Sequence, residues 1–407
     1  MKSNYKRLGN YIQEVKIRNT ELKAKELLGI NIDKFFMPSV ANVIGTDMSV
    51  YKIVKKNQFA CNRMHVGRDY RLPISMSKTD DEFMVSPAYD VFEIKDTETL
   101  YPEFLMMWFS RREFDRNAWF YTDADVRGGL HWKAFCDMQL PIPSITKQRE
   151  IVKEYNVIQN RIVLNQQLIQ KLEETAQAIY KRCFVDFEFP DEEGKPYKSN
   201  GGEMLWCEEL GKEIPKGWEV KNLEEEVSII RGASPRPIED FMSKDNSGMP
   251  WVKISDATAC STRYLFETNE YISLNGVSKS REVKVGTLIL SNSASPGLPR
   301  IMMIDACVHD GWLIFNKYKR ISKEILLEFL IYNRQEIVSS SNGSVFNNLK
   351  TEILKQYRIT VPDKIVIEKL SVVLNKLNNQ LLIRAKYNQT LNSILELILS
   401  KLATIEN

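Results

Sequence analysis

The hydrophobic side chains between residues 151 and 179 recur at alternating steps of four and three residues. This spacing is the heptad pattern of a long helix whose apolar stripe pairs with another helix. The pattern returns 219 residues later, between residues 370 and 398, in the same register. A polar residue interrupts each stripe near its middle, Asn165 in the first and Arg384 in the second. The chain is therefore predicted to contain two long helices related by an internal duplication.

Chance could align two or three positions of any two amphipathic helices. Here the register matches over four heptads, and the prolines that precede the helices, Pro143 and Pro362, match under the same shift. We therefore predict that the chain alternates globule, helix, globule and helix. The predicted domains are residues 1–143 for the first globule, 144–189 for the first helix, 190–362 for a linker and the second globule, and 363–407 for the second helix.

Both globules are predicted to mix strands and helices. Short runs rich in β-branched and aromatic residues, such as residues 49–54 and 89–94, alternate with polar loops in the first globule. Residues 102–114 are predicted to form an amphipathic helix that begins at a proline. Residues 286–290 are expected to form a strand in the second globule.

The expected fold class is α+β, with two mixed globules separated by two long antiparallel coiled-coil helices and related by a pseudo-twofold internal repeat. Antiparallel pairing is expected because globules attached to the amino ends of parallel helices would crowd side by side. Asn165 and Arg384 should then lie within a layer of one another near the centre of the pair, where a buried polar residue fixes the register.

Composition changes this picture little. A content of 43% hydrophobic and 27% charged residues is ordinary for a globular protein. The net charge of +3 is too small to indicate a polyanionic partner, so any basic surface must be local. Six cysteines without a Cys-x-x-Cys pair and three histidines give no zinc or disulfide pattern. No apolar run approaches the length of a membrane span, and a cytoplasmic location is expected.

Clustered cations with small or aromatic neighbours mark residues 62–71 and 121–129 in the first globule, and residues 228–237 of the second carry two arginines. Residues 291–297 form a small polar loop after the predicted strand 286–290. Contact with a DNA groove or with phosphates is the functional interpretation. The alternative is a solvated loop with self-paired charges, as Arg68 beside Asp69 would be. In the first globule the candidate DNA contacts are Arg63, Arg68, Arg71, Lys78, Tyr121, Arg127 and Lys133. In the second they are Arg231, Arg236, Lys253, Ser293, Ser295, Arg300, Ser344, Asn347 and Asn348.

Motifs for catalysis are missing from the sequence. It contains neither an adenine-methyltransferase motif pair, nor a Walker-type phosphate loop, nor Gly-x-Ser-x-Gly. Pro190-Asp191 with Glu193-Gly194-Lys195 superficially resembles a nuclease signature. However, a separation of two residues cannot place those carboxylates on separate strands around a metal ion. We expect a binding protein without catalytic residues, metal or cofactor of its own.

The order of motifs resembles the DNA-specificity subunit of type I restriction-modification systems over essentially the whole chain. The residues that carry the likeness are Pro141-Ile142-Pro143 before a helix with Lys147-Gln148-Arg149-Glu150-Ile151, then Leu172 to Tyr180 leading into Phe184-Val185-Asp186-Phe187, and Ile214-Pro215-Lys216-Gly217-Trp218. One departure is that the second helix has Ile367-Glu368-Lys369 in place of Gln148-Arg149-Glu150.

The resemblance implies that each globule is a target-recognition domain that reads one half of a bipartite double-stranded DNA site. It implies that the helices separate these domains and dock two methyltransferase subunits, which two ATP-dependent restriction subunits can join. S-adenosylmethionine, ATP and Mg are then expected only in the partner subunits. The alternative is a coiled-coil scaffold for proteins without DNA specificity. Candidate docking residues, each of which could instead belong to a solvated helix face, are Arg161, Gln167, Lys171, Lys376, Gln380 and Lys386.

Overall fold

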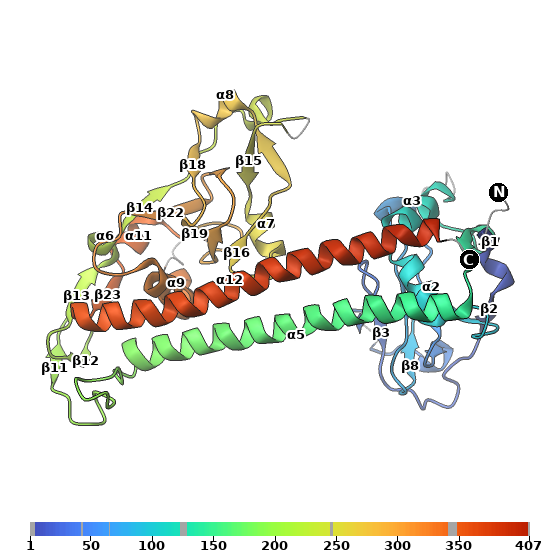
Figure 1. The fold of residues 1–407 in the computed structure, drawn as a ribbon, viewed down its shortest axis with the longest axis horizontal. Helices are drawn as coiled ribbons and strands as arrows, with labels where there is room; N and C mark the ends of the chain where they lie inside the picture. Colours follow the sequence, from blue (N-terminus) through green and yellow to red (C-terminus); the bar gives the residue numbers. More distant parts are fainter. Residues whose placement is uncertain are drawn as a thin grey trace. The chain divides into compact units, whose positions relative to one another are not determined.

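The computed structural model describes residues 5–41, 44–64, 66–122, 128–244, 247–340 and 348–405. The chain divides into two compact units. Unit 1 comprises residues 1–163 together with 389–407, and unit 2 comprises residues 164–388. The division into four domains expected from the sequence stays a prediction, because each compact unit takes a part of both long helices. Figure 1 labels the helices and strands.

The strands of unit 1 are β1 (Tyr5–Arg7), β2 (Ile12–Val15), β3 (Leu28–Ile30), β4 (Phe36–Pro38), β5 (Lys52–Val54), β6 (Phe59–Cys61), β7 (Ile74–Met76), β8 (Phe83–Val85), β9 (Asp90–Ile94) and β10 (Gln139–Pro141). Its short helices are α1 (Val66–Asp69), α2 (Pro102–Phe109), α3 (Arg112–Phe120) and α4 (Trp132–Asp137). Strands β2, β9, β6 and β7 form an antiparallel sheet in that order.

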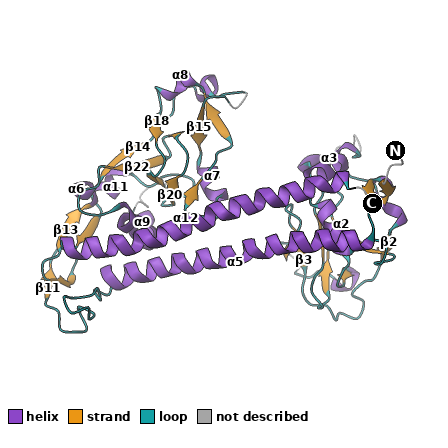
Figure 2. Cartoon of the chain, viewed as in Figure 1, coloured by secondary structure: helices purple, strands orange, loops and turns teal. Residues whose placement is uncertain are grey.

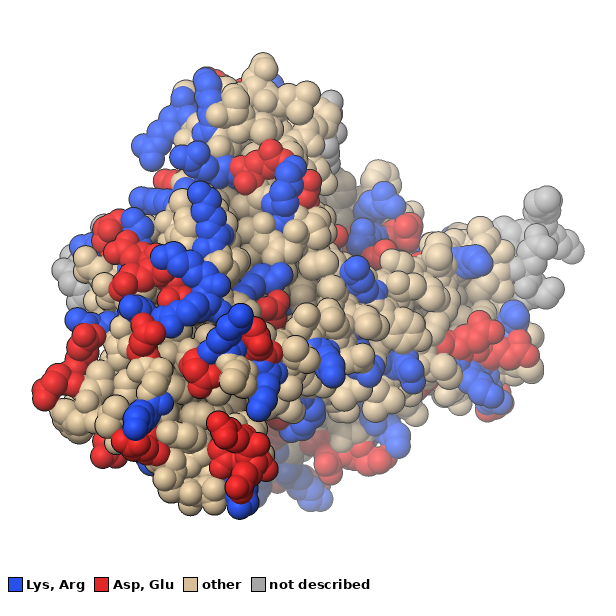
Figure 3. Space-filling view, turned by 60° about the vertical axis from the view of Figure 1, so that its left-hand side comes forward, with Lys and Arg blue, Asp and Glu red and all other residues tan. Residues whose placement is uncertain are grey.

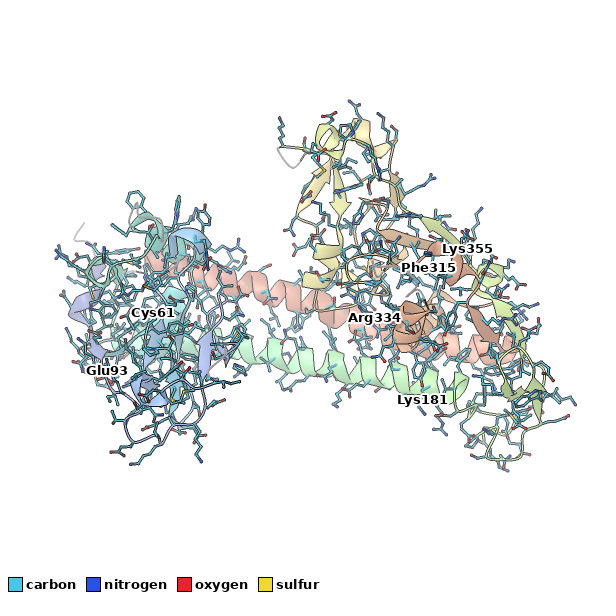
Figure 4. All side chains as sticks on the ribbon, turned by 180° about the vertical axis from the view of Figure 1, so that it is seen from behind. Cys61, Glu93, Lys181, Phe315, Arg334 and Lys355 are labelled. Atoms are coloured by element: carbon cyan, nitrogen blue, oxygen red, sulfur yellow. The ribbon has the colours of Figure 1, made fainter. Side chains whose placement is uncertain are left out.

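An aromatic core holds unit 1 together. Phe59 and Phe92 stack with their ring centroids 5.1 Å apart, and Phe109 and Phe135 pack edge-on or tilted against them. These rings are fully buried, and Figure 4 labels Cys61 in the same core. Burying large rings supplies much of the hydrophobic free energy of so small a sheet.

The strands of unit 2 are β11 (Met204–Cys207), β12 (Lys212–Pro215), β13 (Glu219–Asn222), β14 (Ser228–Arg231), β15 (Met249–Val252), β16 (Tyr264–Leu265), β17 (Glu270–Ile272), β18 (Arg281–Val283), β19 (Leu288–Ser291), β20 (Pro299–Met302), β21 (Ala306–Val308), β22 (Trp312–Asn316) and β23 (Arg358–Val361). Its short helices are α6 (Leu223–Glu226), α7 (Ile254–Ala259), α8 (Leu274–Val277), α9 (Lys323–Tyr332), α10 (Arg334–Ser339) and α11 (Thr351–Lys355).

Two sheets form the body of unit 2, and Figure 2 shows them as orange strands. One has the order β14-β22-β19-β20-β16, and the other has the order β17-β15-β21-β18. Side chains of both sheets share a core that includes Trp312, whose indole N–H donates to the Val252 carbonyl at 3.1 Å. Helix α9 and Phe315, labelled in Figure 4, belong to a second core that includes the long helices.

The two long helices are α5 (Ile145–Phe184) and α12 (Lys364–Lys401). In unit 1, Ile162 of α5 packs against Leu391 and Leu395 of α12. In unit 2, the later part of α5 shares a core with the earlier part of α12, from Leu370 to Ala385. Within each unit the helices therefore run antiparallel, as predicted.

The polar break in the seam differs in detail from the expectation. Asn165 donates through Nδ2 to Asn388 Oδ1 at 3.0 Å, so its partner lies one helical turn beyond Arg384. Arg384 is half-buried, and its Nε has no hydrogen-bond partner among the described residues. An amide pair can satisfy both partners within an apolar seam, whereas a guanidinium needs more acceptors than one amide offers.

The internal duplication is visible in the element boundaries. Helix α4, strand β10 and helix α5 begin at Trp132, Gln139 and Ile145. Helix α11, strand β23 and helix α12 begin at Thr351, Arg358 and Lys364, which is the same shift of 219 residues. In each copy the strand before the long helix pairs antiparallel with an early strand of the same globule, β1 or β13. The repeat inferred from the heptads thus extends into the globules.

A buried polar network joins the globule of unit 2 to both long helices. Arg263 is 4% exposed, and Glu328 of α9 is fully buried. The Arg263 guanidinium donates to the Glu328 carboxylate, to Glu173 of α5 at 3.0 Å and to the side-chain oxygen of Asn378 of α12 at 3.0 Å. Tyr264 donates to the Asn378 carbonyl at 2.6 Å. Burial would lower the pKa of Arg263, but the charges of Glu328 and Glu173 raise it above its ordinary value. The guanidinium is therefore held charged.

The attachment in unit 1 uses a neutral amide. The side chain of Gln148 is fully buried, accepts from the Tyr101 N–H at 2.8 Å and donates to the carbonyls of Thr99 and Pro143 at 2.9 and 2.8 Å. At the equivalent position of the second copy, Ile367 is buried in an apolar core. At this position the sequence departure is thus a change of internal packing, whereas Arg149 and Glu150 and their counterparts Glu368 and Lys369 are exposed.

Candidate nucleic-acid interface

Unit 2 has a surface hollow of about 470 Å³ at one edge of its sheets. Its lining comes from residues 234–236 after β14, 253–255 after β15, 293–294 after β19, and His309 after β21. Strands β14 and β19 run in the same direction in one sheet, as β15 and β21 do in the other. Loops that follow such strands meet at one edge. Three residues predicted as DNA contacts are brought together there: Arg236, Lys253 and Ser293.

Asp310 contacts two of the candidate arginines at this edge of the sheets. Its carbonyl accepts from Arg231 Nε at 2.7 Å, and its carboxylate lies 3.7 Å from Arg231 and 3.8 Å from Arg236. Ser234 donates its hydroxyl to the same carboxylate at 2.9 Å. Partial burial would raise the pKa of Asp310, but the Ser234 hydrogen bond and the Arg231 charge lower it. The ionised Asp310 therefore orients two guanidinium groups, of which Arg236 has a side chain 85% exposed.

His309 supplies a neutral donor at the rim of the hollow. Burial lowers the pKa of its imidazole, and the charge of Lys253 adds to this effect. Its Nδ1 accepts from the Gly311 N–H at 2.8 Å, which leaves the ring proton on Nε2. The sequence interpretation did not include His309 or Ser234. Ser234 lies within the loop of residues 228–237 that the sequence marked, whereas nothing in the sequence distinguished His309.

The loop from Ser293 to Gly297 is held in one conformation. The Asn292 N–H donates to the Gly311 carbonyl at 2.8 Å, and the Leu298 N–H donates to the Ser291 hydroxyl at 2.9 Å. Arg334 of α10, labelled in Figure 4, donates to the Pro296 carbonyl at 3.3 Å. The exposed Ala294 has a φ of 56°, a region that side chains with a Cβ rarely adopt. Strain of this kind is typical of loops that present functional groups.

Other candidate residues of unit 2 lie elsewhere or face other partners. Arg300 is largely buried and donates to the carbonyls of Ala257 and Cys260 at 2.7 and 3.3 Å, which caps the carboxyl end of α7. Lys253 pairs with Glu270, and Ser295 is half-buried and accepts through its carbonyl from Ser291. Asn348 is exposed. Ser344 and Asn347 lie outside the described residues.

The surface of unit 2 carries further charged side chains besides these candidate residues. With this side of the molecule turned forward, Figure 3 shows many Lys and Arg side chains across the upper and central surface, with groups of acidic side chains among them. Local basic surface of this kind is consistent with the small net charge of the whole chain.

In unit 1 the structure joins the two loops that the sequence marked. The Leu130 N–H donates to the Arg63 carbonyl at 2.9 Å, and the Gly67 N–H donates to the Gly128 carbonyl at 2.8 Å. Arg63 itself donates to Asp90 at 2.6 Å and to the Leu130 carbonyl. The Arg63 side chain therefore holds the two loops together.

The remaining candidates of unit 1 stand on its surface. Arg68 makes two hydrogen bonds to Asp69, at 2.7 and 3.0 Å, which is the self-pairing considered as the alternative. Arg71 donates to Asp33 at 2.7 Å. The side chains of Lys78, Tyr121 and Lys133 are exposed. Arg127 lies outside the described residues.

Replacing Gly67 by Ala is expected to push these loops apart. A Cβ on Gly67 would lie 2.7 Å from the Gly128 Cα, and backbone cannot swing aside as a side chain can. We expect a loss of about 1–3 kcal/mol in unfolding free energy, as for other overpacking changes, and weaker DNA binding in a mobility shift. Gly129→Ala is the matched control, because its Cβ would meet no atom closer than 3.8 Å. Equal effects of both substitutions would contradict this account.

The predicted docking residues lie on the outer faces of the long helices. All six of them, Arg161, Gln167, Lys171, Lys376, Gln380 and Lys386, are exposed. Exposed apolar side chains lie among them, which the sequence interpretation overlooked. In unit 2 these include Leu164 of α5 and Val372 and Ile383 of α12, with 59%, 54% and 58% of their surface exposed.

Within the described residues, none of the helices is both long and apolar enough to span a membrane. In the same part of the chain, His, Cys, Asp and Glu side chains form no group of three that would hold a metal ion.

Comparison with known proteins identifies relatives of this chain. Residues 215–387 match the model of the type I restriction modification DNA specificity domain. The MjaIX specificity subunit of a type I restriction enzyme from Methanocaldococcus jannaschii is 24% identical over 68% of this chain and 64% of its own length. The HindI specificity subunit from Haemophilus influenzae is 22% identical over 91% of both chains.

A solved structure shares the fold. The type I restriction-modification S subunit from M. genitalium superimposes with a TM-score of 0.56 at 14% identity, covering 99% of this chain and 96% of that one. The sequence matches show that residues 215–387 match a type I restriction modification DNA specificity domain and that the chain is similar to specificity subunits of type I restriction enzymes.

Proposed function

We propose that this chain recognises a bipartite double-stranded DNA target, with each unit reading one half-site. The observation that carries the proposal is the duplication, in which helix, strand and long helix recur with one shift of 219 residues and each copy has its own polar loops. Two related readers on one chain suit a target of two halves, because half-site spacing is set by protein geometry.

The hollow of unit 2 is the proposed DNA contact of the second half. Arg236 offers an exposed guanidinium suited to a phosphate. Ser293, His309 and Lys253 line the same hollow and offer donors suited to base edges. Contacts with Gly311 and Glu270 position His309 and Lys253. In unit 1 the corresponding proposal is the joined loops with Arg68, Tyr121 and Arg127, together with Lys78 after β7 and Lys133 of α4.

The outer faces of α5 and α12 are the proposed docking surface for two methyltransferase subunits, which two ATP-dependent restriction subunits join. Exposed apolar side chains beside charged ones support this, because a helix face that combines the two suits protein association. S-adenosylmethionine, ATP and Mg are assigned to those partners.

A mobility shift against a random duplex library, with and without a methyltransferase partner, tests the proposal. Bound sequences should converge on two short half-sites at constant spacing, with affinity falling steeply as salt rises. If the chain instead is a protein scaffold without DNA specificity, the bound sequences stay random and the steep salt dependence is absent.

Arg236→Ala is expected to weaken binding to all sequences about equally and to reduce the slope of log affinity against log salt by about 1. The reason is that an exposed guanidinium on a phosphate carries no sequence information. Lys195→Ala is the control, since Lys195 is also an exposed cation paired with an acid, in the linker at Glu193. A change in sequence preference for Arg236→Ala would instead assign that residue to base reading.

A further inference from the structure

Four large aromatic side chains lie exposed together on unit 1, which we call the aromatic cluster: Tyr70, Trp119, Phe120 and Tyr121. Their exposed fractions are 62%, 44%, 77% and 52%, and they make up half of the markedly exposed aromatic side chains of the described residues. Such a group is unusual on a protein surface, because exposing it to water is costly and a patch of this kind usually marks a binding site.

The fold of α3 explains why the rings point outward. Phe114, Asp115 and Ala118 form the buried face of this helix. Phe120 lies on the opposite face, and Trp119, one turn after Asp115, lies at the border of the buried face. Lys34, itself buried, holds Asp115 at 2.8 Å, and the Leu72 N–H donates to the same carboxylate at 3.1 Å. The orientation of α3 is therefore fixed from its buried side.

The rings contact one another in two pairs. Tyr70 and Trp119 have ring centroids 5.3 Å apart, and Phe120 and Tyr121 have theirs 5.6 Å apart in an edge-on arrangement. Tyr70 is held with a φ of 56° at the end of α1, an uncommon conformation for a residue with a side chain. The cluster thus consists of two contacting ring pairs, which are adjacent in sequence at Trp119 and Phe120.

The aromatic cluster lies next to two arginines and to the joined loops of the proposed DNA interface. Arg68 lies two residues before Tyr70, and Arg116 lies one turn before Phe120 on α3. Their side chains are 67% and 74% exposed. The loop that carries Tyr70 is bonded to Gly128 through the Gly67 N–H. Aromatic rings flanked by guanidinium groups match the chemistry of bases flanked by phosphates.

We infer that the aromatic cluster is a stacking surface for a DNA base that has lost its neighbour in the helix, next to the half-site read by unit 1. The inference rests on the proposed function, because a partner that methylates a base takes that base out of the duplex and leaves an unstacked position behind. An exposed ring of the cluster, such as Trp119 or Phe120, would stack on the base at that position irrespective of its identity, as every base has a π-face.

The test uses the full chain and two duplexes of the same arbitrary sequence, one fully paired and one with a single abasic site opposite 2-aminopurine. The chain should bind the abasic duplex more tightly and quench the 2-aminopurine fluorescence. Trp119→Ala and Phe120→Ala should each reduce that preference by about tenfold, and Trp119→Tyr should keep most of it. Trp206→Ala is the control, since Trp206 is also 62% exposed but lies on β11 of unit 2. Thermal melting checks that each variant is folded.

The outcomes separate this inference from the proposed function. A chain that binds paired and abasic duplexes equally, with steep salt dependence, overturns the stacking role and leaves DNA recognition intact. A chain that binds neither duplex overturns the stacking role, and it overturns DNA recognition as well only if it also selects no sequence from the random duplex library. If Trp119→Ala and Phe120→Ala leave DNA binding unchanged but weaken association with the methyltransferase partner, the cluster is a protein contact and the inference is wrong.

Discussion

Replacing Arg263 by Met is expected to lower the unfolding free energy of unit 2 by about 3–5 kcal/mol, the largest stability effect that we expect of a single side chain. The substitution removes the cation that faces Glu328, whose side chain is fully buried, and Glu173. An uncompensated buried carboxylate must either stay charged at high cost or take up a proton. Denaturant unfolding of the full chain, followed through the transition of unit 2, measures the loss.

A second substitution separates the buried charge from the lost packing. The double variant Arg263→Met with Glu328→Gln removes the cation and neutralises the buried carboxylate, so it should recover much of the stability. Arg358→Met is a matched control, because Arg358 pairs with Glu209 at the surface, with side chains 46% and 55% exposed, where ion pairs contribute little. Equal losses for Arg263→Met and Arg358→Met would contradict a special role for the network.

Exchanging residues 1–143 for the matching segment of a related specificity subunit with a known target should change one half of the methylated site. The other half and the spacing should remain, because unit 2 and the long helices are unchanged. Each wrong base pair in a half-site typically costs about 1–3 kcal/mol, so the old half-site should be lost completely. Sequencing of methylated positions in DNA treated with the chimaera and its methyltransferase partner reads the result.

The structure indicates how this exchange must be built. Residues 389–407 belong to unit 1, so a second chimaera should also take this segment from the same relative. Both chimaeras are expected to have the same specificity, with the second more stable to heat. A change in both half-sites would rule out modular reading by the two units.

The long helices and their repeat were predictable because the signal is periodic and local. Heptads fix which face of a helix is buried, and a duplicated chain repeats that pattern at constant shift. The predicted helix over residues 102–114 is wrong in one respect. The chain breaks between α2 and α3 at Arg111, whose ψ is 140°, because Arg111 is buried and lies 4.2 Å over the Trp108 ring. Contacts of that kind depend on tertiary packing and produce no periodic pattern in the sequence.

The candidate interface was predictable only at the level of loops. Arg236, Lys253 and Ser293 meet because their strands end at one edge, which the order of strands decides and the sequence does not show. In sequence, Arg63 and Arg300 cannot be told apart from the other candidate arginines. In the structure, however, their guanidinium groups donate to the backbone carbonyls of Leu130 and Ala257. Side-chain type alone cannot distinguish an arginine that binds a carbonyl from one that is available to a phosphate.

The carboxyl-terminal end of α12 is part of the first globule. Leu402 is buried in the core of unit 1, and the Tyr5 hydroxyl donates to the Ala403 carbonyl at 2.9 Å. During synthesis on the ribosome an amino-terminal domain ordinarily folds first. Here the core of unit 1 is complete only when Ile398, Leu399 and Leu402 have emerged, so unit 1 cannot be finished before α12 has been made. A ribosome that stops early in α12 therefore releases a chain in which neither reader is complete.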